Sequence, residues 1–300
     1  MRSRKKWLPG LLLVSPSIIL VAVFVYGLIG RNVWTSLNVT RNFVTDKVVN
    51  PGGYLNYTQL LGSPDYKHAL FNLLVLSVVF MGGTMLMGLV LSILLEKGVG
   101  AEGFFRSTYL FPMAISFIAA GVVWRWLLSP AQGDGAVGLN QLLQKVGLDS
   151  LQNSWWSSNS KFSMAAMALP AVWQMSGYVM ALFLAGFRGI SVDQREAARF
   201  DGASEWRIYR HVLFPQLSPI ALSALIILGH MSMKMFDLIY SIAGANSYKA
   251  MVPATLMWTQ MFASNDRVAA AVNATILLVI VAVVVVPYLI YTNRVEESNR

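Results

Sequence analysis

The stretch ALFNLLVLSVVFMGGTMLMGLVLSILL, residues 69–95, contains no charged side chain. A bilayer core accepts a helix of about 20 predominantly apolar residues, and no water is available there for backbone groups outside a helix. Residues 69–95 are therefore predicted to cross a membrane. The composition agrees, because 56% of the 300 residues are hydrophobic and only 12% are charged. Soluble domains carry about 25% charged residues, so a soluble protein with an unusually large core is disfavoured.

Five further stretches are apolar enough to cross a bilayer, which predicts an all-α integral membrane fold with six transmembrane helices in one domain, residues 1–300. The predicted spans are about 8–29, 69–95, 107–128, 162–187, 217–242 and 268–292. The first is longer than the apolar part of a signal peptide, and no small-residue cleavage site follows it. It is interpreted as a retained span. Kinks are predicted at the prolines inside spans, Pro16, Pro112, Pro170 and Pro287.

The distribution of Lys and Arg predicts the orientation of the chain. One set of loops and ends, residues 1–7, 96–106, 188–216 and 293–300, holds 13 of these residues in 55 positions. The opposite set, residues 30–67, 125–161 and 245–267, holds 9 in 98 positions. The denser side is expected to be cytoplasmic. Both termini and the loop 188–216 are thus predicted to lie in the cytoplasm.

The same distribution accounts for the net charge of +9 without a nucleic acid partner, because no basic face with interleaved aromatic residues is found. The absence of cysteine and the presence of only three histidines leave no constellation for nucleophilic or metal catalysis. No catalytic residue and no metal site are predicted, and no GxxxxGK[ST] phosphate-binding loop is present.

The predicted cytoplasmic loop 188–216 is much longer than a simple connection requires. Its sequence predicts a helix–turn–helix, because Gly202 follows Asp201 in a turn and Ser204 can cap a second short helix. In that second helix Trp206, Tyr209 and Leu213 are expected to share a face. Composition alone leaves two interpretations open, an amphipathic hairpin on lipid headgroups and a docking element for another protein.

The loop also carries a long-spaced motif, Glu196-Ala197-Ala198, Gly202, Val212 and Phe214-Pro215. It resembles the EAA loop of ABC importer permeases, although Val and Phe replace the more usual Ile and Leu. YLNYTQLL (54–61) and MKMFDLIY (233–240) resemble elements of the first permease subunit of the maltose type. FPMAISFIAAGVVWRW (111–126) is similar to α-glucoside-type permeases. The resemblance covers about residues 7–294, but AGANS stands where Gly-Gly-Pro is frequent.

This resemblance implies a non-catalytic permease subunit of an ATP-driven importer for a small oligosaccharide, expected to be an α-glucoside disaccharide. The implied location is a bacterial or archaeal plasma (inner) membrane, crossed several times. The implied partners are a second homologous permease subunit in a heterodimer, two ATPase subunits and an extracytoplasmic sugar-binding protein. No cofactor is expected on this chain, since ATP and Mg would bind to the partner ATPase.

The resemblance also assigns residues. The expected ATPase-coupling residues are Glu196, Ala197, Ala198, Arg199, Asp201, Gly202, Trp206, Tyr209 and Arg210. Sugar contacts of the maltose type lie on the spans before and after the EAA loop. The matching positions here are Gln174, Met175, Tyr178, Ser232 and Met235, of which Met235 replaces a polar position.

Two charged residues lie inside the predicted fifth span. Lys234 and Asp237 are three residues apart on one helical face, so they can neutralise each other as an intramembrane ion pair. Hydrogen bonding to sugar hydroxyls is the functional alternative. A secondary transporter and a non-transporting membrane scaffold are rival functions. The first needs ionisable coupling residues at mid-membrane, and the second does not require the EAA spacing.

Overall fold

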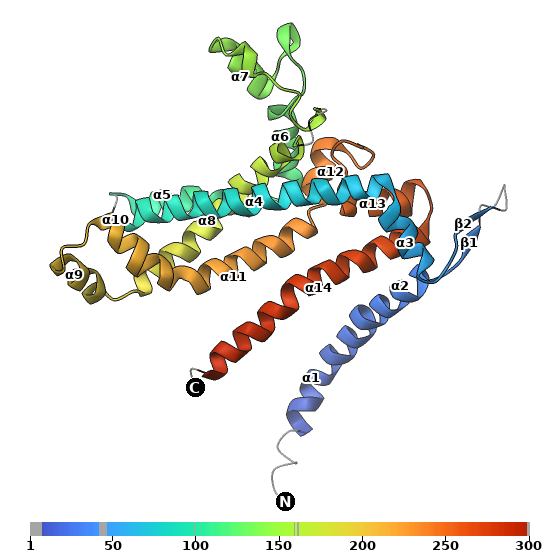
Figure 1. Ribbon diagram of the computed structural model, residues 1–300, viewed down its shortest axis with the longest axis horizontal. Coiled ribbons are helices and arrows are strands. Elements are labelled where there is room, and N and C mark those ends of the chain that lie inside the picture. The colour runs from blue at the N-terminus through green and yellow to red at the C-terminus, as the bar shows by residue number, and fades with distance from the viewer. Residues whose placement is uncertain (1–7, 42–46, 99, 159, 161, 299–300) are drawn as a thin grey trace, which may run out of the picture. The chain divides into compact units, whose positions relative to one another are not determined.

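The computed structural model describes residues 8–41, 47–98, 100–158, 160 and 162–298. The described chain is mainly helical and forms two compact units (Figure 1). The first unit comprises Met1–Tyr66 and Met257–Val279, and the second comprises Lys67–Leu256 and Ile280–Arg300. Each unit is built around helices that are long and apolar enough to cross a membrane.

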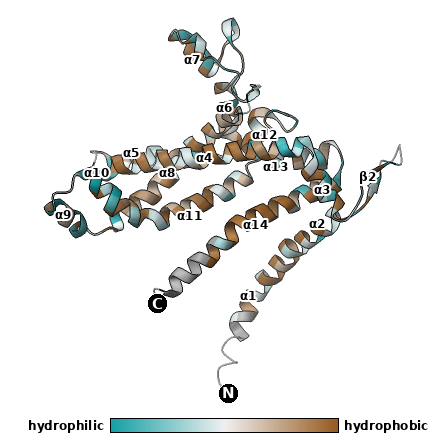
Figure 2. Cartoon of the chain, in the orientation of Figure 1, coloured by the Kyte–Doolittle hydropathy of each residue, from teal (hydrophilic) through white to brown (hydrophobic). Residues whose placement is uncertain are grey.

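Five such helices occur among the described residues: Leu12–Ser36, Pro64–Glu96, Met164–Gly189, Glu205–Met233 and Arg267–Pro287. A sixth candidate is a pair of shorter helices, Glu102–Ala114 and Phe117–Leu127, bent by 96°. An all-α membrane fold is thus confirmed at the level of helix content and candidate spans. Figure 2 shows hydrophobic residues along α4 (Pro64–Glu96) and α14 (Arg267–Ser298), and a concentration of hydrophilic residues in α10 (Glu205–Ile208).

The region predicted as the third span, 107–128, is interrupted. It contains the end of α5 (Glu102–Leu110), the 3₁₀ turn η3 (Phe111–Ala114) and α6 (Phe117–Leu127). Pro112 has no N–H to continue a helix. Ser116 adopts an extended conformation, and its Oγ accepts a hydrogen bond from the N–H of Ala119 at 3.2 Å, which starts a new helix.

The predicted fifth span, 217–242, is also interrupted. Helix α11 (Phe214–Met233) ends before Lys234, and α12 (Asp237–Ala243) begins three residues later. In the break the N–H of Phe236 bonds to the carbonyl of Lys234 at 2.8 Å, which is incompatible with helical geometry. Hydropathy alone does not reveal such a break, because its neighbours remain apolar.

In the first unit α1 (Leu8–Val21), the π-helical turn η2 (Ala22–Gly27) and α2 (Leu28–Ser36) are consecutive. A two-stranded antiparallel hairpin that was not predicted follows, with β1 (Thr40–Arg41) paired to β2 (Val48–Asn50). The side chain of Asn32 donates to the carbonyl of Ala271 at 3.1 Å and to Thr275 Oγ1 at 3.0 Å. These bonds join α2 to the first part of α14.

The YLNYTQLL stretch forms most of α3 (Leu55–Gly62), and its Asn56 is buried. The Nδ2 group of Asn56 donates to the carbonyls of Ser36 and Asn38 at 2.8 and 3.0 Å. Its Oδ1 accepts from the N–H of Gly52 at 2.8 Å. One side chain therefore fixes the chain on both sides of the hairpin. The π-helical turn η8 (Thr259–Ala263) also belongs to this unit.

The core of the second unit lies around α8 (Met164–Gly189), 14 of whose 26 residues are buried. In Figure 1, α4, α8 and α11 run side by side. Gly88 of α4 lies so close to α8 that a Cβ there would meet Val179 Cγ1 at 2.7 Å. Small residues at such contacts allow close packing of helices within membranes.

Between α6 and α8 the chain forms a small lobe that contains η4 (Gly133–Gly135), α7 (Gly138–Lys145), η5 (Asp149–Leu151) and η6 (Trp155–Ser157). Buried Asn140 holds it together. Its Nδ2 donates to three carbonyls, and its Oδ1 accepts from the N–H of Asn153 and from Trp155 Nε1, both at 3.1 Å. The remaining element before α14 is α13 (Pro253–Trp258).

Candidate functional site

The loop between α8 and α11 folds as a helix–turn–helix, with α9 (Val192–Phe200), α10 (Glu205–Ile208) and the π-helical turn η7 (Tyr209–Leu213). Gly202 ends α9 with φ of +75°. The N–H of Ala203 bonds to the carbonyl of Ala198, and the N–H of Gly202 bonds to that of Arg199, both at 3.0 Å. This is a Schellman motif, which favours glycine at the left-handed position.

The expected coupling residues divide into two groups. Those on the surface are Glu196, Ala197, Arg199, Asp201, Gly202, Trp206 and Arg210, whereas Ala198 is half-buried and Tyr209 is buried. Arg199 forms an ion pair with Glu205 across the turn, with Nη2 2.8 Å from Oε1. Both side chains are more than half exposed, so water screens this pair. No ion pair of Glu196 occurs within the described residues.

Sequence reasoning did not single out Phe200, whose side chain is 91% exposed. Val192 and Trp206 are each 66% exposed on the same helix–turn–helix. These are the large apolar side chains that the helix–turn–helix exposes most among its described residues. The position of Phe200 directly before an Asp-Gly turn was the available signal.

The predicted common face of Trp206, Tyr209 and Leu213 does not form. Trp206 is exposed, and Ile208 is buried beside Tyr209 and Leu213. The π-helical turn at Tyr209–Leu213 changes the angular spacing of the side chains from Tyr209 onward, and Ile208 takes the inner position that was predicted for Trp206. Tyr209 instead packs against Phe187 and Phe214, with ring centroids 5.9 Å apart in each case.

A charged cluster that the sequence analysis missed anchors this helix–turn–helix to α4 and α8. Arg195 Nη1 forms an ion pair with Oε1 of Glu96, the last residue of α4. Tyr209 Oη donates to Glu96 Oε2 at 2.7 Å. Arg195 Nη2 also bonds to the carbonyl of Phe187 near the end of α8, at 3.4 Å. We call Glu96, Arg195 and Tyr209 the Glu96 cluster.

Most of the expected sugar-contact residues are buried in the second unit. Gln174 Nε2 donates to the carbonyl of Ile115 in the break between η3 and α6, and its Oε1 has no partner among the described residues. Ser232 is also buried; it donates to the carbonyl of Gly229 at 2.8 Å and accepts from Ser77 Oγ at 2.9 Å. Both polar side chains thus have structural bonds.

The other three expected contacts differ in accessibility. Met175 and Met235 are buried in the main hydrophobic core. Tyr178 is half-buried, and no hydrogen bond of its hydroxyl is found among the described residues. Five residues earlier on α8, Trp173 is 38% exposed and its ring lies 6.1 Å from that of Trp124. Tyr178 is therefore the expected contact with the most accessible polar group.

Lys234 and Asp237 lie on either side of the break between α11 and α12. Both are exposed in this chain, and the described residues contain no ion pair between them. The helical spacing that suggested a pair is interrupted, since Lys234 is no longer in the helix and Asp237 starts a new one. His230, on the last turn of α11, is half-buried.

Comparison with known proteins identifies the family. The family model for the "binding-protein-dependent transport system inner membrane component" matches residues 88–295. The chain belongs to this family. The matched part of the permease includes α9, α10 and the Glu96 cluster.

Several relatives of this permease are named for sugars. A probable ABC transporter permease protein of Pyrococcus horikoshii is 36% identical over 96% of each chain. A xylose/arabinose import permease protein of Haloferax volcanii is 35% identical over 78% of this chain and 73% of its own. An alpha-glucoside transport system permease protein of Rhizobium meliloti is 24% identical over 96% of this chain and 83% of its own. The resemblance to carbohydrate-uptake permeases is confirmed.

The fold has a solved counterpart. A chain of a bacterial ABC transporter involved in the import of the acidic polysaccharide alginate superimposes with a TM-score of 0.74 and 20% identity, over 97% of this permease and 96% of that chain. At this identity the likeness concerns the fold.

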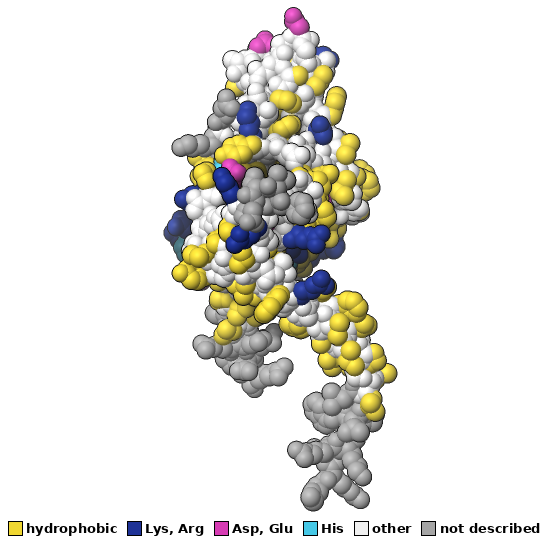
Figure 3. Space-filling view, turned by 90° about the vertical axis from the view of Figure 1, so that its right-hand side faces the viewer, with side chains coloured by type: hydrophobic (Ala, Val, Ile, Leu, Met, Phe, Trp, Pro, Cys, Tyr) yellow, Lys and Arg dark blue, Asp and Glu magenta, His cyan; other side chains and the backbone are white. Residues whose placement is uncertain are grey.

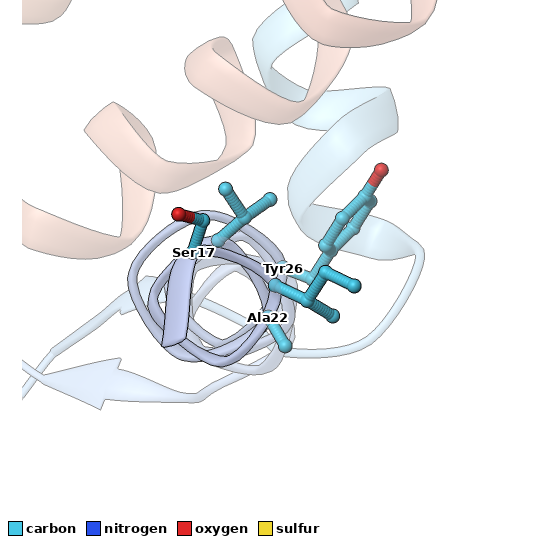
Figure 4. Close-up of a pocket in the computed structure, with 5 residues that line it drawn as sticks. Ser17, Ala22 and Tyr26 are labelled. Carbon is cyan, nitrogen blue, oxygen red and sulfur yellow. The ribbon is translucent and has the colours of Figure 1, made fainter. Parts of the chain in front are cut away.

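A shallow pocket lies on the first unit of the permease. It is formed by Ser17, Ile18, Val21, Ala22 and Tyr26 along α1 and η2 (Figure 4). All five side chains are exposed, and its lining is almost entirely apolar. Figure 3 shows hydrophobic side chains along the N-terminal helix on the face it presents. An apolar helix surface of this kind suits lipid or another membrane helix rather than a sugar.

Proposed function

We propose that this permease forms one half of the membrane channel of an ABC importer for a small oligosaccharide, with an α-glucoside disaccharide as the first candidate. The channel alternates between inward-open and outward-open states, driven by ATP hydrolysis on separate ATPase chains that bind ATP and Mg. The observation that carries the proposal is the helix–turn–helix at 192–208, whose EAA spacing coincides with an exposed apolar surface.

The proposed orientation places both termini and residues 188–216 in the cytoplasm. It is supported by the denser Lys and Arg content of residues 1–7, 96–106, 188–216 and 293–300. In this orientation α9 and α10 face the compartment that contains ATP. The short helices are then positioned to receive motion from an ATPase below the membrane.

Docking of the ATPase would bury the exposed aromatic side chains of this loop. Covering a Phe or Trp side chain contributes about 1.5–3 kcal/mol, so Phe200 and Trp206 are the proposed anchors. Gly202 lies between them in the sequence and Ala197 three residues before Phe200, and neither has a bulky side chain to obstruct a close approach. Arg207 and Arg210 are exposed and supply positive charge at the edge, where an acidic partner surface would complement them.

The proposed sugar path runs past the middle of α8. Tyr178 offers a hydroxyl and a ring face, and Trp173 offers a second ring that is partly exposed. Aromatic faces and neutral hydrogen-bonding groups suit a neutral sugar. Gln174 and Ser232 are proposed to shape this path from within the helix packing, because their side chains are buried and already bonded.

The proposed assembly contains a second homologous permease, two ATPase subunits and an extracytoplasmic sugar-binding protein. A binding protein is supported by the family description, and the ATPases by the exposed loop. The second permease is supported by Lys234 and Asp237, which are exposed next to a helix break in a predicted span. Charged groups there need a partner protein or a water-filled path.

Reconstitution tests the proposal. The permease, its companion permease and the ATPase are placed in proteoliposomes with the binding protein outside and ATP inside. We expect ATP-dependent accumulation of a labelled α-glucoside disaccharide and no ATP hydrolysis by the permease alone. Accumulation of a labelled pentose without accumulation of the α-glucoside would show that the substrate is a pentose and not an α-glucoside. Uptake that proceeds without the ATPase would refute the ABC mechanism.

A further inference from the structure

We propose that the Glu96 cluster is the link through which the coupling helices move α4 together with α8 and α11. This inference rests on the proposed function of α9 and α10 as the ATPase-coupling element. The chain itself connects the helix–turn–helix to α8 on one side and to α11 on the other. Helix α4 packs on α8 but has no chain connection to the helix–turn–helix, and Arg195 with Tyr209 supplies a direct contact.

The electrostatic setting of Glu96 explains why the connection is specific. Glu96 is the last residue of α4, where the partial negative charge of the helix end disfavours a carboxylate. Arg195 offsets this charge, and it lies at the same time against the carbonyl of Phe187 near the end of α8. One guanidinium group from α9 therefore joins the ends of two apolar helices.

The burial of the cluster argues for a positioning role rather than a contribution to stability. The side chains of Arg195 and Glu96 are only 18% and 13% exposed. Arg195 Nε is buried and has no partner among the described residues. Taking both charges out of water costs about as much as their attraction returns, so such a pair adds little net stability. Its main effect is to specify which groups lie together.

The two sides of α9 have different roles, since one is bound to α4 and the other is exposed. Arg195 is bound to Glu96, whereas Phe200 is 91% exposed at the end of the same helix. A short rigid helix with an anchored side and a free side passes displacement from one to the other. Without the anchor, α9 can follow the ATPase while α4 stays behind.

The test compares sugar transported with ATP hydrolysed in the reconstituted importer. In Glu96→Gln the side chain keeps its shape and loses its charge. We expect ATP hydrolysis to continue and sugar transported per ATP to fall about tenfold, a coupling loss within the usual allosteric range. Glu102→Gln is the matched control. It breaks the ion pair of Glu102 with Arg188 (2.6 Å), which does not involve α9, and should leave the ratio within about twofold.

A distance measurement tests the mechanical part directly. The chain has no cysteine, so spin labels can be placed at Leu94→Cys on α4 and Asp193→Cys on α9. Both positions are exposed. We expect one narrow distance distribution that is the same with and without nucleotide, and a broad, nucleotide-dependent one after Glu96→Gln. An unchanged distribution and an unchanged transport ratio in Glu96→Gln would overturn the inference.

Two further variants keep the outcome decisive. If Glu96→Gln does not assemble, Glu96→Asp retains the charge, shortens the reach by one methylene and should show the same loss of coupling. Phe200→Ala separates this inference from the proposed function. If Phe200→Ala loses ATPase binding while Glu96→Gln keeps normal coupling, the linking role of the Glu96 cluster is refuted and the docking surface is retained. Normal ATPase binding in Phe200→Ala combined with Trp206→Ala would refute the docking surface itself.

Discussion

Helix α4 holds the segments on both sides of α11, but it does so by different chemistry at its two ends. Glu96 binds the segment before α11 through the side chains of Arg195 and Tyr209. Near the other end, buried Asn72 binds the segment after α12 through backbone groups, donating to the carbonyls of Lys249 and Met251 at 3.1 and 2.8 Å.

The difference indicates that the Asn72 end of α4 is fixed and that the Glu96 end is suited to regulated movement. Asn72 is 1% exposed and its partners are backbone carbonyls. These bonds therefore do not depend on which side chains Lys249 and Met251 carry. His68 reinforces this end, since its ring stacks on Tyr248 with centroids 4.6 Å apart. At the Glu96 end the link consists of side chains alone, on a helix whose outer surface is uncovered. Variants at each end can therefore test this contrast.

The largest effect is expected from Asn72→Asp, at the end of α4 where the bonding groups are uncharged. A carboxylate there would face two backbone carbonyls without donating a proton to them. The free energy of unfolding should fall by about 3 kcal/mol, from unsatisfied buried groups. Thermal unfolding of the purified permease in detergent measures it. Ser77→Ala on the same helix removes a single bond to Ser232 and should cost about 1 kcal/mol. Equal effects of the two variants would contradict the importance of Asn72.

At the other end, Gly202→Val should abolish most of the sugar uptake while leaving membrane insertion intact. A β-branched residue is disfavoured at φ of +75°, and the local cost is about 1–2 kcal/mol. Uptake into proteoliposomes is the measurement. Gly202→Asn is the control, because Asn tolerates this backbone region. A side chain at 202 meets no atom of this chain within 4 Å, so a loss of uptake in the Asn variant as well would indicate contact with the ATPase.

Between the two ends, Tyr178→Phe should raise the KM for sugar several-fold without changing assembly. The lost hydroxyl contributes one hydrogen bond to a neutral ligand, about 0.5–1.5 kcal/mol. Concentration-dependent uptake by the reconstituted importer measures this. Trp173→Phe retains a ring at the neighbouring position and serves for comparison. A fall in complex yield with unchanged KM would assign Tyr178 to packing instead.

The smallest effect is expected from Arg199→Gln. Its ion pair with Glu205 lies on the uncovered side of α9, and the side chains are 58% and 61% exposed. Exposed pairs contribute about 0–1 kcal/mol, so the melting temperature of the isolated permease should hardly change. A large decrease would show that the outer side of α9 is anchored as firmly as the inner side, and the contrast within α9 would be lost.

The sequence was informative where one local feature decides the structure. Uncharged stretches such as 69–95 predict spans, and Asp201-Gly202 predicts the turn between the short helices. The breaks were harder to predict. Pro112 suggested a kink, but nothing local reveals that Ser116 starts a new helix after a 96° bend, or that α11 ends before Lys234.

Contacts between residues far apart in the sequence could not be predicted from it. Glu96 and Arg195 are 99 positions apart, and no periodicity links a residue after the second span to one inside the loop after the fourth. Helical spacing groups Tyr209 with Trp206 on one face, whereas the structure buries Tyr209 and exposes Trp206. The sugar-path residues follow from the resemblance, and only the structure distinguishes accessible Tyr178 from buried Gln174.

The central claim is that the surface of α9 and α10 meets a cytoplasmic ATPase, and a single cysteine can test it because the natural chain has none. Phe200→Cys is labelled with a membrane-impermeant maleimide in vesicles of known orientation. We predict labelling in inside-out vesicles stripped of the ATPase, protection when the ATPase is added back, and none in right-side-out vesicles. Labelling from the outside, or equal labelling with and without the ATPase, would contradict the account.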